Sequence, residues 1–247
     1  MKALGHFILA IQFLTRIHLT GKNMPCEKED FKGAMSFFTI IGLIIGLFQY
    51  GAFCLTFYLT GEAFMSAVVT TFVGIYLTGG MHLDGLADLF DGFGAQKDRE
   101  KTLEIMKDSR VGSFGVIGLL ADITLHIAGI MALRSNPLWI VLVPLVGKWS
   151  VVLLCYTGTC ASKGLGALWI QNISRKGVLL NTLVVIGIGS WILKPLDLGL
   201  LLLLALFYTL GFKKVVTQKL GGVTGDCLGA MQQLTEWLVL LLLLSFQ

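Results

Sequence analysis

The chain has 247 residues, of which 55% are hydrophobic and only 14% are charged. An ordinary soluble domain carries roughly 25% charged residues, so this composition excludes a water-soluble globular domain. The formal net charge of +4 is modest, and the basic residues lie between apolar runs rather than in one stripe, which argues against nucleic acid as a partner.

Apolar runs follow one another along the chain, each close to the length of about 20 residues that a helix needs to cross a hydrocarbon core of about 30 Å. They are continuous rather than alternating, which indicates helices and not the strands of a membrane barrel. We therefore predict an all-α polytopic membrane bundle that forms one membrane-embedded catalytic domain over residues 1–247. The predicted spans are 34–60, 63–81, 111–133, 137–157, 177–194, 196–212 and 228–246.

The N-terminal segment is also apolar but differs from a secretory signal peptide. Gln12, Arg16 and His18 stand where a cleavage site requires small residues. We expect a retained helix that lies in the interface or re-enters the membrane.

The basic residues predict the orientation of the bundle. If the segment before the first span is cytoplasmic, most of the 19 lysine and arginine residues lie on the cytoplasmic side, and the opposite loops hold only Arg134 and Lys194. The longer polar segments 82–110, 158–176 and 213–227 share that side. We therefore expect a protein of the cell (inner) membrane whose active site is on the cytoplasmic face.

Residues 79–92, GGMHLDGLADLFDG, carry the strongest motif. Asp84, Asp88 and Asp91 are spaced i, i+4, i+7, so a helix would place them on one face. Like charges so arranged destabilise a helix, and desolvation beside the membrane adds to the cost. We predict that they bind Mg²⁺, which prefers oxygen ligands, and that Asp84 and Asp88 are catalytic. The alternative is a solvated polar face paired with nearby lysines.

His82 precedes this acidic face. It is a candidate general base near neutral pH, although a histidine at the interface needs no function.

A second polar cluster precedes the next span, and its candidate substrate-binding residues are Lys107, Asp108, Ser109 and Arg110. The planar fork of Arg110 suits a phosphate, and Lys107 could add a point charge. The alternative is positive-inside flanking with Asp108 or Ser109 as a helix cap.

A third cluster precedes the last span, and its candidate substrate-binding residues are Lys219, Gly221, Gly222, Thr224 and Gly225. A glycine-rich turn before a helix presents backbone N–H groups to anions. Asp226 could complete the metal shell. The alternative is an ordinary loop in which Thr224 or Asp226 caps the final helix.

Polar residues also occur within the predicted spans. Lys148 lies near the middle of one, where it could contact a phosphate or pair structurally with an aspartate. Asp122 and His126 share a helix face at i, i+4, which favours an interhelical hydrogen-bonded pair over catalysis.

The three clusters together resemble cobalamin synthase, the adenosylcobinamide-GDP ribazoletransferase family of bacteria and archaea. The resemblance runs through residues 80–88 with Asp91-Gly92, then 106–110 with Gly112 and Gly115, then 221–226 with 228–230. Residues 13–17, FLTRI, also match, although His18 stands where the family often has proline.

The resemblance implies a magnesium-requiring enzyme at the last stage of vitamin B12 nucleotide-loop assembly. Its substrates would be adenosylcobinamide-GDP and α-ribazole or its 5'-phosphate, and its products adenosylcobalamin, or its 5'-phosphate, and GMP. On this basis the chemistry favours Asp84, Asp88, Asp91 and Asp226 as metal ligands. The candidate diphosphate contacts are Arg110, Lys219 and the backbone of Gly221, Gly222 and Gly225.

Two other functions remain open from the sequence. A CDP-alcohol phosphatidyltransferase also uses clustered aspartates, but its signature D-x-x-D-G-x-x-A-R has arginine where this chain has Asp88. A cation-coupled transporter would account for Asp122, His126 and Lys148 but not for the three clusters.

Overall fold

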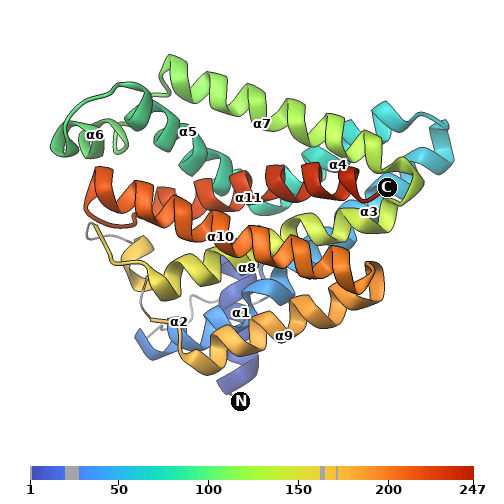
Figure 1. The fold of residues 1–247 in the computed structure, drawn as a ribbon, viewed down its shortest axis with the longest axis horizontal. Coiled ribbons are helices and arrows are strands. Elements are labelled where there is room, and N and C mark those ends of the chain that lie inside the picture. The colour runs from blue at the N-terminus through green and yellow to red at the C-terminus, as the bar shows by residue number, and fades with distance from the viewer. Residues whose placement is uncertain (1, 20–27, 162–164, 171) are drawn as a thin grey trace.

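The computed structural model describes residues 2–19, 28–161, 165–170 and 172–247 (Figure 1). Lys22 and Lys163, two of the basic residues behind the predicted orientation, lie outside this part of the chain.

The described chain is built from helices, as predicted. The α-helices are α1 (Lys2–Leu14), α2 (Lys28–Ala34), α3 (Phe38–Thr60), α4 (Ala63–Thr78), α5 (Met81–Gly94), α6 (Arg99–Ile105), α7 (Ser113–Ala132), α8 (Leu142–Thr157), α9 (Arg175–Ile192), α10 (Pro195–Leu220) and α11 (Gly225–Ser245). Short 3₁₀ helices cover Met35–Phe37, Leu133–Ser135, Pro137–Val141 and Leu165–Leu168.

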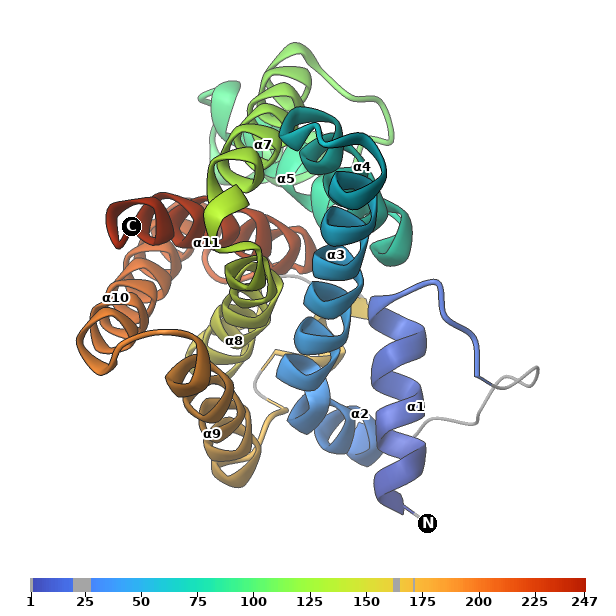
Figure 2. The same ribbon diagram turned by 90° about the vertical axis from the view of Figure 1, so that its right-hand side faces the viewer.

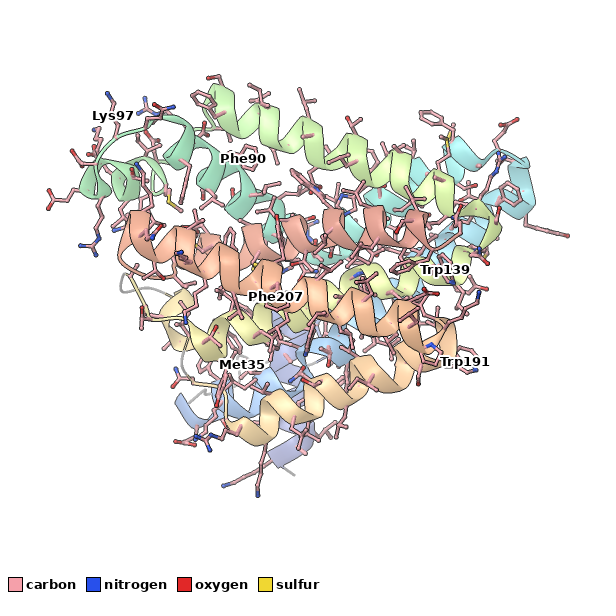
Figure 3. All side chains as sticks on the ribbon, viewed as in Figure 1. Met35, Phe90, Lys97, Trp139, Trp191 and Phe207 are labelled. Carbon is pink, nitrogen blue, oxygen red and sulfur yellow. The ribbon has the colours of Figure 1, made fainter. Side chains whose placement is uncertain are left out.

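Among the described residues, 6 helical segments are long and apolar enough to cross a membrane, or 7 if the bent pair α4 and α5 counts as one span. This agrees with the predicted bundle. The connections from α5 to α7 and from α10 to α11 lie at one end of the bundle (Figure 1). Lys97 lies at that end, whereas Trp139 and Trp191 lie at the other (Figure 3). The protein therefore has the form of a multi-pass membrane bundle with two distinct faces.

α8 is the central helix. It packs against α3, α9, α10 and α11, which surround it in Figure 2. Nearly all of its residues are buried, including Lys148, which is only 1% exposed. A charged side chain therefore lies at the middle of the fold.

The predicted span 63–81 differs from the structure at its end. Gly79 and Gly80 both adopt left-handed backbone conformations, with φ of 66° and 74°, which favour glycine. α4 stops there, and α5 leaves at an angle of 91°. The acidic segment is therefore a separate helix, which packs mainly on α11 and α7.

The predicted span 196–212 is shorter than the helix found there, which includes much of the polar segment 213–227. α10 continues to Leu220, because Lys213, Lys214 and Lys219 are good helix formers and suit a helix end that leaves the membrane. Gly221, with φ of 76°, ends the helix. Only residues 221–224 connect α10 to α11.

α1 differs from the spans in length and direction. Its 13 residues extend about 20 Å, less than a bilayer core. It runs crosswise to α7, α9, α10 and α11 (Figure 1), and Ala10, Ile11 and Leu14 are buried against the bundle. These features favour the interfacial position predicted from the sequence.

Candidate active site

A cavity of about 360 Å³ lies between α1, α3, α5, α8 and α11. The residues of its lining that the sequence had singled out are His82, Asp84, Lys107, Lys148, Thr224, Gly225 and Asp226. They come from all three sequence clusters and from the buried position on α8. The structure thus brings distant segments into one site.

The close crossing of α5 and α11 builds the acidic part of this cavity. At Gly85, a Cβ atom would lie 2.7 Å from the backbone oxygen of Asp226 and 3.0 Å from its Cα. At Gly229, a Cβ atom would lie 3.1 Å from the backbone oxygen of His82. Glycine at both positions allows the two backbones to touch, and this contact places Asp84 and Asp226 on the same cavity.

Four carboxylates gather around this crossing. Burial and the charges of Asp84, Asp226 and Asp91 all act against ionisation of Asp88. Asp84 is exposed, whereas Asp88 and Asp226 are half-buried. Within the described residues, no three histidine, cysteine or acidic side chains are arranged to hold a metal ion by themselves. The donors present fit a cation held by one or two carboxylates together with substrate phosphates, the usual pattern for Mg²⁺.

Asp91 has a structural partner. Its two carboxylate oxygens accept hydrogen bonds from the backbone N–H groups of Gly112, at 2.7 Å, and Gly115, at 2.8 Å. These groups belong to the N-terminus of α7, where orphan donors and the helix dipole favour an anion. Asp91 therefore caps α7 from a neighbouring helix, and its predicted role as a metal ligand stays a prediction.

Replacing Asp91 by alanine should lower the free energy of unfolding by about 1–2 kcal/mol, because the start of α7 loses its acceptors. Thermal unfolding in detergent, followed by circular dichroism, would measure the change. If the unfolding midpoint did not move while magnesium-dependent turnover disappeared, Asp91 would belong to the metal shell and not to the cap.

In the second cluster, Lys107 lies at the cavity, whereas Arg110 and Ser109 are exposed to solvent. The sequence favoured Arg110 over Lys107 for phosphate contact, but Lys107 lines the cavity. The Arg110 side chain is 88% exposed, and its Nη2 donates to Oδ2 of Asp108 at 2.6 Å. These hydrogen bonds lower the pKa of Asp108 to about 2. Ser109 is exposed and does not line the cavity.

The third cluster forms a tight turn between α10 and α11. Gly221 lies beside Arg99, whose Nε donates to the backbone oxygen of Leu220 at 2.7 Å. Lys219 donates through Nζ to the backbone oxygen of Lys97 at 2.6 Å, so it contacts the α5–α6 connection and does not line the cavity. The sequence did not identify Arg99, because a basic residue in a cytoplasmic loop carries no distinctive signal.

Backbone pairing holds the same turn in place. The N–H of Val223 donates to the oxygen of Thr159 at 2.7 Å, and the N–H of Ala161 donates to the oxygen of Val223 at 3.0 Å. Gly222 approaches this segment so closely that a Cβ atom would lie 2.5 Å from the oxygen of Thr159. Gly221 and Gly222 therefore shape the turn, and they do not line the cavity.

Thr224 caps the final helix, which was the alternative to substrate binding that the sequence left open. Its Oγ1 accepts from the backbone N–H of Cys227 at 3.3 Å. Thr224, Gly225 and Asp226 all line the cavity, so the N-terminus of α11 faces it. The capping role and a position at the site occur together.

His82 and Lys148 form a buried pair. Lys148 Nζ lies 2.6 Å from His82 Nε2. Whether Nε2 donates or accepts depends on the histidine tautomer, and in either case this nitrogen is occupied by Lys148. This contact argues against His82 as the general base. The partner of Lys148 is a histidine and not the aspartate that the sequence suggested.

Asp122 and His126 belong to a hydrogen-bonded network between α7 and α11, as predicted. His126 Nε2 lies 2.9 Å from Glu236 Oε2, and Trp237 Nε1 donates to Asp122 Oδ1 at 2.7 Å. Gln232 donates to the other oxygen of Glu236. The sequence gave no role to Glu236, although a carboxylate inside an apolar run was a visible signal.

Comparison with known proteins decides between the functions that the sequence left open. The family described as cobalamin-5-phosphate synthase matches residues 6–244. The chain belongs to this family.

Curated relatives named adenosylcobinamide-GDP ribazoletransferase extend over nearly the whole chain. The protein of Clostridium tetani is 37% identical over 252 residues, covering 99% of this chain and 98% of the relative. The protein of Alkaliphilus metalliredigens is 37% identical over 245 residues, covering 98% and 95%. No solved structure matches the chain.

Membership of the family gives the chain its general function. It is a polytopic membrane transferase of cobalamin synthesis, and the phosphatidyltransferase and transporter alternatives are not supported. The polar cavity beside Asp122, His126 and Lys148 measures only about 30 Å³, room for no more than a few water molecules.

Proposed function

We propose that the protein transfers the adenosylcobinamide phosphate group from adenosylcobinamide-GDP to α-ribazole or its 5'-phosphate, with release of GMP. The observation that carries this proposal is the crossing of α5 and α11 at Gly85. It places the carboxylates of Asp84 and Asp226 on the cavity that Lys107 and Lys148 also line. Acidic and basic groups around one cavity are what transfer between a diphosphate and a hydroxyl group requires.

The reaction exchanges one phosphorus–oxygen bond for another. A hydroxyl oxygen of ribazole bonds to the phosphorus that carries the cobinamide. The bond from that phosphorus to the bridging oxygen breaks, and GMP leaves with the electron pair. The hydroxyl proton needs an acceptor within reach, and we assign it to Asp84, an exposed carboxylate on the cavity.

Asp84, Asp88 and Asp226 are the groups that we propose to hold Mg²⁺. When bound, the metal ion would neutralise negative charge on the phosphoryl oxygens. Because the charges of the neighbouring carboxylates repel that of Asp88, a bound cation would stabilise the ionised group.

Lys107, Lys148 and the N-terminus of α11 are the proposed contacts of the diphosphate. Lys148 is buried and fixed by its hydrogen bond to His82. His82 therefore acts as a positioning residue in our scheme. Positive groups that are already in place need no reorganisation when charge develops on the phosphate.

The cavity volume of about 360 Å³ suits a nucleoside and its phosphate. A corrin ring with its side chains is much larger. We therefore place the corrin outside the cavity, with only the end of its phosphate linker inside.

Purified protein in detergent should release GMP when given adenosylcobinamide-GDP, α-ribazole and Mg²⁺, and removal of the metal with a chelator should stop the reaction. Omitting α-ribazole distinguishes transfer from hydrolysis. A CDP-activated lipid tested in parallel should not react. Turnover of that lipid, without turnover of the cobinamide substrate, would overturn the proposal.

The cytoplasmic location of the site is also a proposal, and it rests on the distribution of basic residues. In a variant without the native cysteines, Lys97→Cys should resist an impermeant thiol reagent in intact cells and react after permeabilisation. Lys194→Cys, in the connection from α9 to α10, should react in intact cells. The reverse labelling pattern would show that the bundle has the opposite orientation in the membrane.

A further inference from the structure

An aromatic wall made by Phe13, Phe31, Phe38 and Trp169 borders the candidate site, and three of its members, Phe13, Phe38 and Trp169, line the cavity. We propose that this aromatic wall binds the flat base of ribazole and that Trp169 donates a hydrogen bond to the base. The inference rests on the proposed function and specifies where the nucleoside substrate lies.

The aromatic wall is assembled around Trp169 from separate helices. The Trp169 ring lies 4.4 Å from that of Phe13 on α1, 4.9 Å from that of Phe31 on α2, and 5.1 Å from that of Phe38 on α3. Trp169 is only 1% exposed. Phe13 belongs to the N-terminal motif of residues 13–17, which the acidic and basic clusters leave without a role.

Trp169 carries an unsatisfied polar atom. Its Nε1 is buried and has no hydrogen-bond partner among the described residues. An indole N–H can only donate, and a buried donor without an acceptor is costly enough to require an explanation. A ligand acceptor atom that reached this N–H would satisfy it.

The base of ribazole is a dimethylbenzimidazole, which matches both features of the aromatic wall. It is planar and apolar, suited to stacking on aromatic rings. Its only free polar atom is the ring nitrogen that is not bonded to the sugar, and this atom is an acceptor.

Guanine, the other base in the reaction, fits less well. It carries several donors and acceptors, all of which would need partners when buried. Leu14, Val151 and Leu228 also line the cavity, and they offer no polar side-chain group. The polar lining residues, such as Asp84, Lys107 and Lys148, belong to the proposed metal and diphosphate sites. The apolar part of the lining, which packs in one cluster with Phe38 and Trp169, therefore favours the ribazole base over guanine.

The test compares ribazole with the corresponding indole riboside, in which a C–H group replaces the free ring nitrogen. Wild-type protein should bind the indole riboside about 10-fold more weakly, since one hydrogen bond to a buried donor is lost. Trp169→Phe keeps an aromatic ring but removes the N–H. It should raise the KM for ribazole by about 10-fold, abolish the preference between the two nucleosides, and leave the KM for adenosylcobinamide-GDP unchanged.

Two further variants separate stacking from hydrogen bonding. Phe13→Leu should weaken the binding of both nucleosides several-fold, while the preference for ribazole over the indole riboside remains. Trp191→Phe is the matched control, because Trp191 is 77% exposed on α9, and it should change neither KM.

Equal binding of the two nucleosides to wild-type protein, measured by calorimetry, would refute the inference even if Trp169→Phe failed to fold. A Trp169→Phe variant that altered only the KM for the cobinamide substrate would refute it as well, since the aromatic wall would then bind the other substrate. If wild-type protein released no GMP yet bound ribazole in preference to the indole riboside, the proposed reaction would fail and the inference would survive.

Discussion

Asp84→Asn and Asp88→Asn are each expected to reduce GMP release by about 10³-fold, the size of effect seen when a key electrostatic contact to a transition state is removed. Asparagine keeps the shape of aspartate but loses the charge that attracts Mg²⁺. At Asp84 it also removes the proposed proton acceptor. The fold should survive, because each substitution relieves repulsion among the carboxylates around Asp88.

Steady-state turnover over a range of Mg²⁺ concentrations and thermal unfolding of the same preparations would test this. Asp197→Asn is a suitable control, since Asp197 lies in the first turn of α10, away from the cavity. It should behave as wild type. Full activity of Asp84→Asn at limiting Mg²⁺ would remove that residue from both proposed roles, and lower stability in either variant would argue against charge repulsion.

Gly85→Ala should lower turnover by about 100-fold, because catalysis is sensitive to displacements of about 1 Å. The new methyl group would lie 2.7 Å from the backbone oxygen of Asp226. Backbone cannot rotate away as a side chain can, so α5 and α11 must separate. Such overpacking should also destabilise the protein by about 1–3 kcal/mol.

Gly187→Ala provides the comparison for Gly85→Ala. Gly187 also lies within a helix, α9, but a Cβ atom there would meet nothing within 4 Å. The activity of the Gly187→Ala variant should be unchanged, and its stability should be unchanged or slightly higher, because alanine favours the helix. Equal losses in the two variants would show that the close crossing has no special role.

The fold was predictable where one physical rule dominates. The requirement that a span be long and apolar gave α7, α8, α9 and α11 with small errors in their limits. The rule failed at Gly79 and Gly80, where paired left-handed residues turn the chain. It also failed at the end of α10, whose lysines extend the helix beyond the apolar run.

The site was predictable in its chemistry but not in its geometry. Charge spacing indicated the acidic helix, and the structure places Asp84 and Asp226 together on the cavity. Spacing could not show that Asp91 caps α7 or that Arg110 pairs with Asp108. The cap is a tertiary contact between α5 and α7, which a local pattern does not contain. Asp108 and Arg110 are only two residues apart, but their spacing alone does not show that the two side chains bond to each other and not to a substrate. Trp169 was missed because a tryptophan in a polar connection has no local signal of function.

The crossing of α5 with α11 also has a consequence for biosynthesis. Asp84 reaches the membrane early during translation, whereas Asp226 is made 142 residues later. An unfinished nascent chain therefore exposes like charges without the helix that completes their surroundings. Catalytic competence should appear late and abruptly, upon insertion of the final helix, and truncated products should be inert.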